Sequence, residues 1–101
     1  MKALSIREPY VSQIVNGSKT AEYRSWPTKH RGDLLICGSK TVDGPFAGMA
    51  ACIVRIVDCI RAEDGGYAWM IEDVRPLAPF PVTGRLSFFE VEVPTKRQDR
   101  I

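Results

Sequence analysis

The sequence predicts an α+β fold, a small, mostly antiparallel β-barrel or half-open sheet with one or two short flanking helices. Three observations predict it. The chain has 101 residues, which suits one domain over residues 1–101 with one core. Its composition, 45% hydrophobic and 26% charged, is typical of globular proteins. Five or six strand-like runs occur without the repeated strand–helix units that a parallel sheet needs.

The chain begins with a strand followed by a short helix. Residues 3–6 are an apolar run that predicts a strand. Pro9 suits a first helical turn, because that position needs no backbone N–H. Residues 10–16 carry apolar side chains at helical spacing, and Gly17 is a good helix stop. We therefore expect a helix of about two turns.

A second strand is expected over residues 19–26. With a period of two, Thr20, Glu22 and Arg24 share one face of this strand. That face is polar, so it is the candidate functional face.

The remaining strands are expected further along the chain. Residues 33–39 and 49–60 are long apolar runs, and residues 67–73 follow after a turn. Residues 74–84 contain three prolines and predict an extended connection. Residues 85–93 alternate as a closing strand.

Basic charge is concentrated in the N-terminal part of the chain. The formal net charge is +2, but residues 1–40 carry seven Lys or Arg against three acids, whereas residues 41–101 carry seven against nine. An anionic partner could be attracted if the fold gathers this excess on one face.

The cysteines do not predict a disulfide framework or a metal site. Cys37, Cys52 and Cys59 are odd in number, lie in apolar stretches and lack C-x-x-C spacing. Cys52 and Cys59 are seven residues apart and are expected on opposite faces of one strand. We expect reduced thiols, a cytoplasmic location, no bound metal and no cofactor. The longest uncharged run, residues 44–54, is too short to span a membrane, and no membrane partner is expected.

Lys19, Glu22 and Arg24 are the candidate chemical residues. A lysine in a turn and two strand residues on one face can converge into a cationic clamp around a carboxylate. Such a clamp could hold a phosphate while Glu22 accepts a proton or a base-edge N–H. Alternatively, Glu22 and Arg24 simply pair in solvent, which contributes well under about 1 kcal/mol.

Three segments carry a family resemblance. The strings "ALSIREPY", "NGSKTAEYRSW" and "RGDLLICGSK" resemble an ASCH domain, a branch of the PUA-like superfamily with the signature G-x-K-x-x-E-x-R. The signature reads here as Gly17, Lys19, Glu22 and Arg24. The likeness continues through residues 57–91 and so covers nearly the whole chain.

The resemblance implies a PUA-like β-barrel whose cleft, lined by the signature, binds RNA or another nucleic acid. Some relatives are hydrolases that act on RNA or on acetylated cytidine. It thus implies Lys19 and Glu22 as catalytic residues if the protein is an enzyme. In the acetylcytidine amidohydrolases a lysine and a threonine of the motif do the chemistry. Lys19 matches that lysine, but Glu22 replaces the threonine, so their mechanism does not transfer intact.

Further residues are expected to join the signature in binding nucleic acid. Arg7, Ser39 and Lys40 come from segments that resemble the family's and could contact phosphates, or they could be solvated strand ends. Tyr10 and Trp26 could stack on bases, at roughly 1 to 3 kcal/mol per base. Trp69, in an apolar strand, is expected in the core.

Three functions follow from this sequence. The first is a module that binds RNA or a nucleotide through the charged cleft. The second is a small hydrolase acting on RNA phosphodiesters or a modified nucleoside such as acetylcytidine, with Glu22 as general base. The third is a protein-interaction adaptor with a vestigial cleft.

Overall fold

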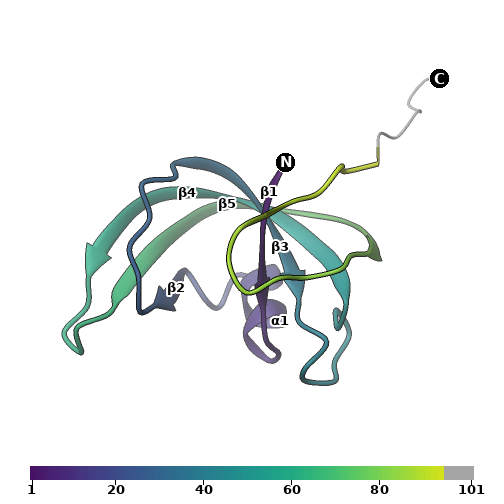
Figure 1. Ribbon diagram of the computed structural model, residues 1–101, viewed down its shortest axis with the longest axis horizontal. Coiled ribbons are helices and arrows are strands. Elements are labelled where there is room, and N and C mark those ends of the chain that lie inside the picture. The colour runs from purple at the N-terminus through teal and green to yellow at the C-terminus, as the bar shows by residue number, and fades with distance from the viewer. Residues whose placement is uncertain (95–101) are drawn as a thin grey trace.

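The computed structural model of the chain describes residues 1–94, which form a six-stranded sheet and one α-helix. The strands lie in the order β2-β5-β4-β3-β1-β6 across the sheet (Figure 1). In chain order the elements are β1 (Lys2–Ile6), α1 (Tyr10–Val15), β2 (Ala21–Arg24), β3 (Gly32–Gly38), β4 (Met49–Arg61), β5 (Tyr67–Pro81) and β6 (Phe89–Glu90).

The sheet is mostly antiparallel, as expected, but it does not close into a barrel. Its two outer strands, β2 and β6, do not pair with each other within residues 1–94. These strands have four and two residues, so they offer few backbone groups for a closing ladder. The long strands β4 and β5 instead curve into an arch, with α1 beneath it (Figure 1). The expected closed barrel is therefore corrected to an open, curved sheet.

One strand pair is parallel and matters for the site. β1 pairs with β3 from Ala3 opposite Leu35 to Ile6 opposite Gly38. The pairing continues past the strand ends, because the backbone N–H of Ser39 donates to the carbonyl of Ile6 at 2.9 Å. The chain segments that leave both strands therefore start side by side.

The helix α1 covers one face of the sheet. Val11 and Ile14 are fully buried there, which matches the apolar spacing of the sequence. Gly17 follows with φ of +86°, a left-handed conformation that glycine adopts readily and that ends the helix. Within residues 1–94, no helix is long and apolar enough to cross a membrane.

The prolines after residue 73 lie inside a strand, which corrects the expected connection over residues 74–84. β5 continues to Pro81, and Pro76 and Pro81 pair with Cys52 and Met49 of β4. On its other side β5 pairs with β2 only as far as Met70. Beyond that point β5 is an edge strand, where a missing N–H removes no ladder hydrogen bond.

The closing strand is much shorter than predicted. Of residues 85–93, only Phe89 and Glu90 form β6, paired with Ala3 and Lys2. The residues just before β6 run past the end of β1, where Leu86 is 98% exposed. Alternation in the sequence did not reveal that this segment leaves the sheet.

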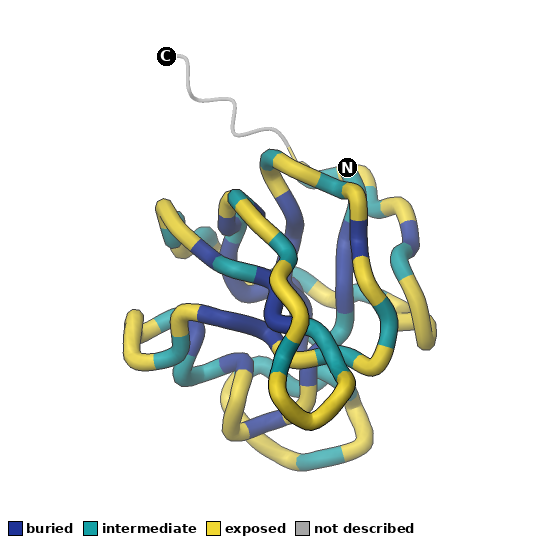
Figure 2. Tube along the Cα trace, turned by 90° about the vertical axis from the view of Figure 1, so that its left-hand side faces the viewer, coloured by how far each residue is buried: buried dark blue, intermediate teal, exposed yellow. Residues whose placement is uncertain are grey.

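The core consists of two clusters, one on each face of the sheet. Figure 2 shows the buried positions along the chain trace. On the face covered by α1, Leu4, Ile36 and Val54 pack around the fully buried Trp69, as expected for that tryptophan. A smaller cluster on the other face contains Leu35 and Phe89 among its members. The helix thus packs on the larger cluster, on the side where the candidate site begins.

The cysteines are unpaired, as expected, but one prediction about them was wrong. Burial raises the pKa of Cys37 to about 12 and that of Cys52 to about 11, so neither is a thiolate at neutral pH. Cys59 packs against the same core cluster as Cys52 rather than on the opposite face. A register shift between Ile56 and Asp58 explains this, because it changes the alternation of β4.

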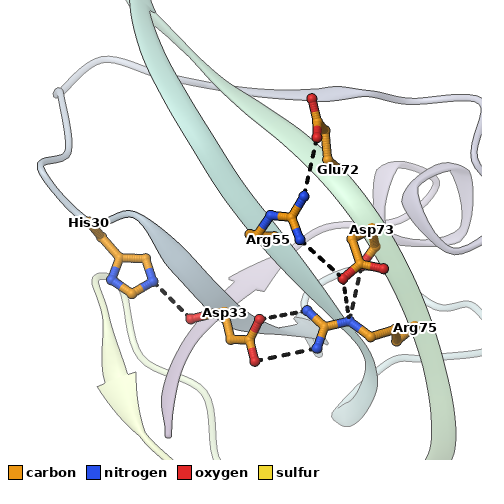
Figure 3. Close-up of polar contacts among 6 residues, drawn as sticks. All are labelled: His30, Asp33, Arg55, Glu72, Asp73 and Arg75. Carbon is orange, nitrogen blue, oxygen red and sulfur yellow. Dashed lines mark hydrogen bonds and ion pairs between the residues drawn. The ribbon is translucent and has the colours of Figure 1, made fainter.

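An ion-pair network crosses the exposed surface of three strands (Figure 3). Arg75 of β5 contacts Asp33 of β3 at 2.6 Å and Asp73 at 3.2 Å. Arg55 of β4 contacts Asp73 at 3.5 Å and Glu72 at 3.4 Å. The hydrogen bond from Arg75 holds the pKa of Asp33 below its usual value. These groups are exposed, so solvent and salt weaken the network.

Candidate functional site

A cavity of about 580 Å³ opens at the end of β1, between α1, β2 and the segment that precedes β6. Six of the eight predicted site residues line it, namely Arg7, Tyr10, Lys19, Glu22, Arg24 and Ser39. They come from three separate parts of the chain, which the parallel pairing of β1 with β3 and the position of α1 bring together.

Lys19, Glu22 and Arg24 converge in this cavity. The Glu22 carboxylate lies 3.8 Å from Lys19 Nζ and 2.9 Å from Arg24 Nε. The contact with Arg24 Nε is close but lacks the alignment of a hydrogen bond, so we treat it as ionic. The three side chains are 15%, 11% and 20% exposed, respectively. They are therefore a sheltered cluster and not a pair dispersed in solvent.

Burial and charge act in opposite directions on Glu22. Burial raises the pKa of the Glu22 carboxyl above its ordinary value, and the charges of Arg24 and Lys19 lower it by less. The carboxyl therefore holds a proton to higher pH than an exposed glutamate does. Both effects are stronger than they would be for an exposed glutamate, because the carboxyl is withdrawn from water.

Arg24 is fixed by the backbone of two strands. Its Nη2 donates to the carbonyl of Ser5 at 2.9 Å, which ties β2 to β1 across the cavity. β2 itself is positioned by β5, with Glu22 opposite Trp69 and Arg24 opposite Tyr67. Glu22 and Arg24 therefore lie on a strand that is paired with β5, the strand that carries Trp69.

Lys19 is placed by the end of α1. Its backbone N–H donates to the carbonyl of Gln13 at 3.1 Å, just after the turn at Gly17. Its Nζ lies 5.2 Å from the ring centre of Tyr10 and 5.0 Å from that of Tyr23. Such cation–π contacts restrict the ammonium group while both rings keep exposed surface, 45% for Tyr10 and 63% for Tyr23.

Two predicted site residues lie elsewhere. Lys40 lines a neighbouring cavity, described below. Trp26 does not line the main cavity, because its ring packs edge-on against Trp69 at 4.6 Å and Phe88 at 5.5 Å between ring centres. The Trp69 Nε1–H also donates to the carbonyl of Trp26 at 3.2 Å. This packing favours a core role for Trp26, and its stacking on bases stays a prediction.

Sequence reasoning missed six residues of the cavity: Ser5, Ile6, Tyr23, Thr41, Arg85 and Leu86. Strand alternation predicted that Tyr23 lies with Ala21 on the opposite face from Glu22 and Arg24, and so outside the site. The expected strand over residues 85–93 concealed Arg85 and Leu86. No local signal identifies Ser5 or Thr41, because they reach the cavity only through the pairing of β1 with β3.

Glu8 was also missed, although it supports the site. Its carboxylate accepts hydrogen bonds from the backbone N–H and hydroxyl of Ser12, at 3.1 and 2.7 Å, and from the backbone N–H of Phe46 at 3.2 Å. The residue is only 7% exposed. Glu8 thus joins α1 to the loop after β3, which carries Ser39 and Lys40. The available signal in the sequence was an acidic residue beside Pro9, just before the apolar helix.

Metal chemistry has no candidate ligands in the described part of the chain. Residues 1–94 contain no group of three or more His, Cys, Asp or Glu side chains that could hold a metal ion.

Together, the open sheet, the helix and the cavity at the end of β1 define an ASCH-type domain of the PUA-like superfamily. The ASCH domain model matches residues 4–76, and the chain belongs to this family. A search of curated protein sequences gave no match.

Solved structures of an ASCH protein from Zymomonas mobilis share the fold. The unmodified protein superposes with a TM-score of 0.70 and 13% identity, covering 90% of this chain and 87% of that one. A point mutant of the same protein gives a TM-score of 0.71 with 12% identity, covering 90% and 89%. At this identity the likeness concerns the fold alone.

Proposed function

We propose that the main cavity binds single-stranded RNA or a nucleotide by holding a phosphate between Lys19 and Arg24. The observation that carries this proposal is the excess of cations at the cavity. Lys19, Arg24, Arg7 and Arg85 line it, and Glu22 is the one acid among its lining residues. Four cations against one acid favour an anionic ligand, and Lys19 and Arg24 are the two cations that are sheltered from water.

The aromatic residues support a nucleotide over a free anion. Tyr10 and Tyr23 line the same cavity and keep exposed ring surface on either side of Lys19. A base can stack on such a ring while its phosphate contacts the cations, and stacking tolerates any base. Glu22 is available to accept an N–H from a base edge.

The proposal is tested by titrating a fluorescently labelled single-stranded RNA at about 50 mM and about 200 mM salt. Affinity is expected to fall with salt, with a logarithmic slope of about −0.7 for each phosphate that is neutralised. The variant Lys19→Ala is expected to bind more weakly and to lose about 0.7 of that slope.

Lys29→Ala is the matched control, because Lys29 is an exposed lysine that lines none of the cavities. It is expected to leave both affinity and slope close to those of the native protein. Absence of binding at low salt, or native affinity in Lys19→Ala, would exclude the proposal.

The second candidate is a hydrolase that acts on RNA phosphodiesters or on a modified nucleoside such as acetylcytidine. The raised pKa of Glu22 favours it, because a carboxylate with a higher pKa is a stronger general base near neutral pH. In this function Glu22 accepts the proton of the nucleophile, while Lys19 and Arg24 stabilise the developing negative charge.

Incubating RNA and acetylcytidine with concentrated protein distinguishes the two functions. Release of shortened RNA or acetate that is lost in Glu22→Gln would support the hydrolase. Unchanged substrates together with salt-dependent binding would exclude the hydrolase and support the binding module. A pull-down that recovers protein but no nucleic acid would favour the adaptor.

A further inference from the structure

A second cavity of about 320 Å³ adjoins the main one on the side of the loop after β3. The two cavities share part of their lining, including Ser39, Thr41 and Arg85. The Ser39 and Thr41 hydroxyls lie 2.9 Å apart, and the Thr41 N–H donates to Ser39 Oγ at 3.2 Å. This hydrogen-bonded turn fixes both hydroxyls at the shared wall.

The second cavity carries positive charge. Lys40 and Arg85 line it, and no carboxylate and no aromatic ring is among its lining residues. Neither cation makes an ion pair within residues 1–94. Such a site suits the sugar–phosphate backbone of a nucleic acid better than a base.

Glycines allow the chain to approach closely around this cavity. The side chain of Lys40 lies over Gly48, where an added Cβ would come within 2.8 Å of the Lys40 side chain. Gly48 also has a φ of +73°, which glycine tolerates. Gly84 in turn approaches Ser5 so closely that a Cβ there would collide with the Ser5 hydroxyl. The side chain of Lys40 thus passes along the cavity wall over Gly48.

A third cavity, of about 410 Å³, adjoins the main one at Tyr23 and Arg24. It is lined by Asp64 and Tyr67 and has no cation other than Arg24. A carboxylate here disfavours a phosphate. The charges therefore favour continuation of a polyanion toward Lys40 and not toward Asp64.

We infer that the second cavity is a phosphate subsite that holds the next backbone phosphate of a single-stranded RNA whose first nucleotide occupies the main cavity. Lys40 and Arg85 bind that phosphate, with Ser39 and Thr41 between the two positions. This inference rests on the proposed function. It adds that the ligand is an oligonucleotide and not a single nucleotide.

The test compares the dissociation constants of uridine monophosphate and tetrauridylate by calorimetry. The tetramer is expected to bind about tenfold or more tightly, because it adds a charge-assisted phosphate contact. In Lys40→Gln, which removes the charge but keeps much of the stem, this ratio is expected to fall toward one. The salt slope of the tetramer is expected to fall by about 0.7.

Lys40→Arg is expected to restore the ratio, and Lys29→Gln is the control that leaves it unchanged. Equal affinity for the two ligands, or an undiminished ratio in Lys40→Gln, would overturn the subsite while leaving the main cavity as a nucleotide site. Failure of both ligands to bind would overturn the proposed function as well.

Discussion

At the scale of single residues, Glu22 shows how burial and charge compete. Two cations lie within 4 Å of its carboxylate, yet the cost of removing the carboxylate from water outweighs their attraction. The folded protein consequently favours the protonated form more than the unfolded chain does. This difference in proton binding makes the free energy of unfolding depend on pH.

Because folding raises the pKa of Glu22 above its ordinary value of 4.5, the contribution of this group to stability is present below pH 4.5. It is lost as the pH rises through the higher, folded-state pKa. Relative to Glu22→Gln, which does not titrate, the native free energy of unfolding is expected to decrease over that interval. Urea unfolding of both proteins at a series of pH values measures the difference.

Glu63→Gln is the control for this pH series, because Glu63 is exposed in the turn after β4. Its difference from the native protein is expected to vary much less with pH. A native stability that rises relative to Glu22→Gln above pH 4.5 would contradict the assignment, since it would mean that the ion pairs prevail over burial.

At the scale of secondary-structure elements, Glu8 connects a helix to a loop. Its two carboxylate oxygens serve different elements, one the start of α1 at Ser12 and the other the loop at Phe46. Gly44 also lies against the Glu8 side chain, where an added Cβ would come within 2.8 Å of a carboxylate oxygen. The loop that carries Ser39 and Lys40 therefore depends on the carboxylate of Glu8, a residue far from this loop in the sequence.

Glu8→Gln is expected to lower the free energy of unfolding by about 1 to 3 kcal/mol, because the amide nitrogen cannot accept a hydrogen bond and one partly buried N–H loses its partner. Urea denaturation measures the change. Glu90→Gln serves as the comparison, because Glu90 is exposed on β6 and, within residues 1–94, its carboxylate pairs with the N-terminal amine. Equal effects of the two variants would refute this role for Glu8.

At the scale of the whole molecule, an open sheet depends on its main core more than a closed barrel does. Among residues 1–94 the sheet has two unpaired edges, so packing against α1 and around Trp69 stabilises its curvature. Trp69 is fully buried, contacts Trp26 and Phe88, and satisfies its N–H within the protein. Trp69 of β5 also lies opposite Glu22 of β2, so this one strand pair contributes residues to both the core and the cavity.

Trp69→Ala is expected to cost about 3 to 5 kcal/mol, the usual range for removing a large buried aromatic side chain. That is a large part of the roughly 5 to 15 kcal/mol by which small domains are stable. Thermal and urea unfolding followed by circular dichroism measure it. Ile60→Ala, at an apolar position that is 48% exposed, is expected to change stability far less, and a similar loss in both variants would contradict the central role of Trp69.

The sequence by itself determined the local features of this protein. The helix, the first five strands in outline and the spacing of Lys19, Glu22 and Arg24 follow from periodicity and turn residues, which act between near neighbours. Only the tertiary structure decided that the sheet stays open and that β5 continues through its prolines. It also decided that Ser5, Thr41 and Arg85 line the same cavity as the signature residues. These outcomes depend on which distant strands pair and where each ladder ends, and no local pattern specifies that.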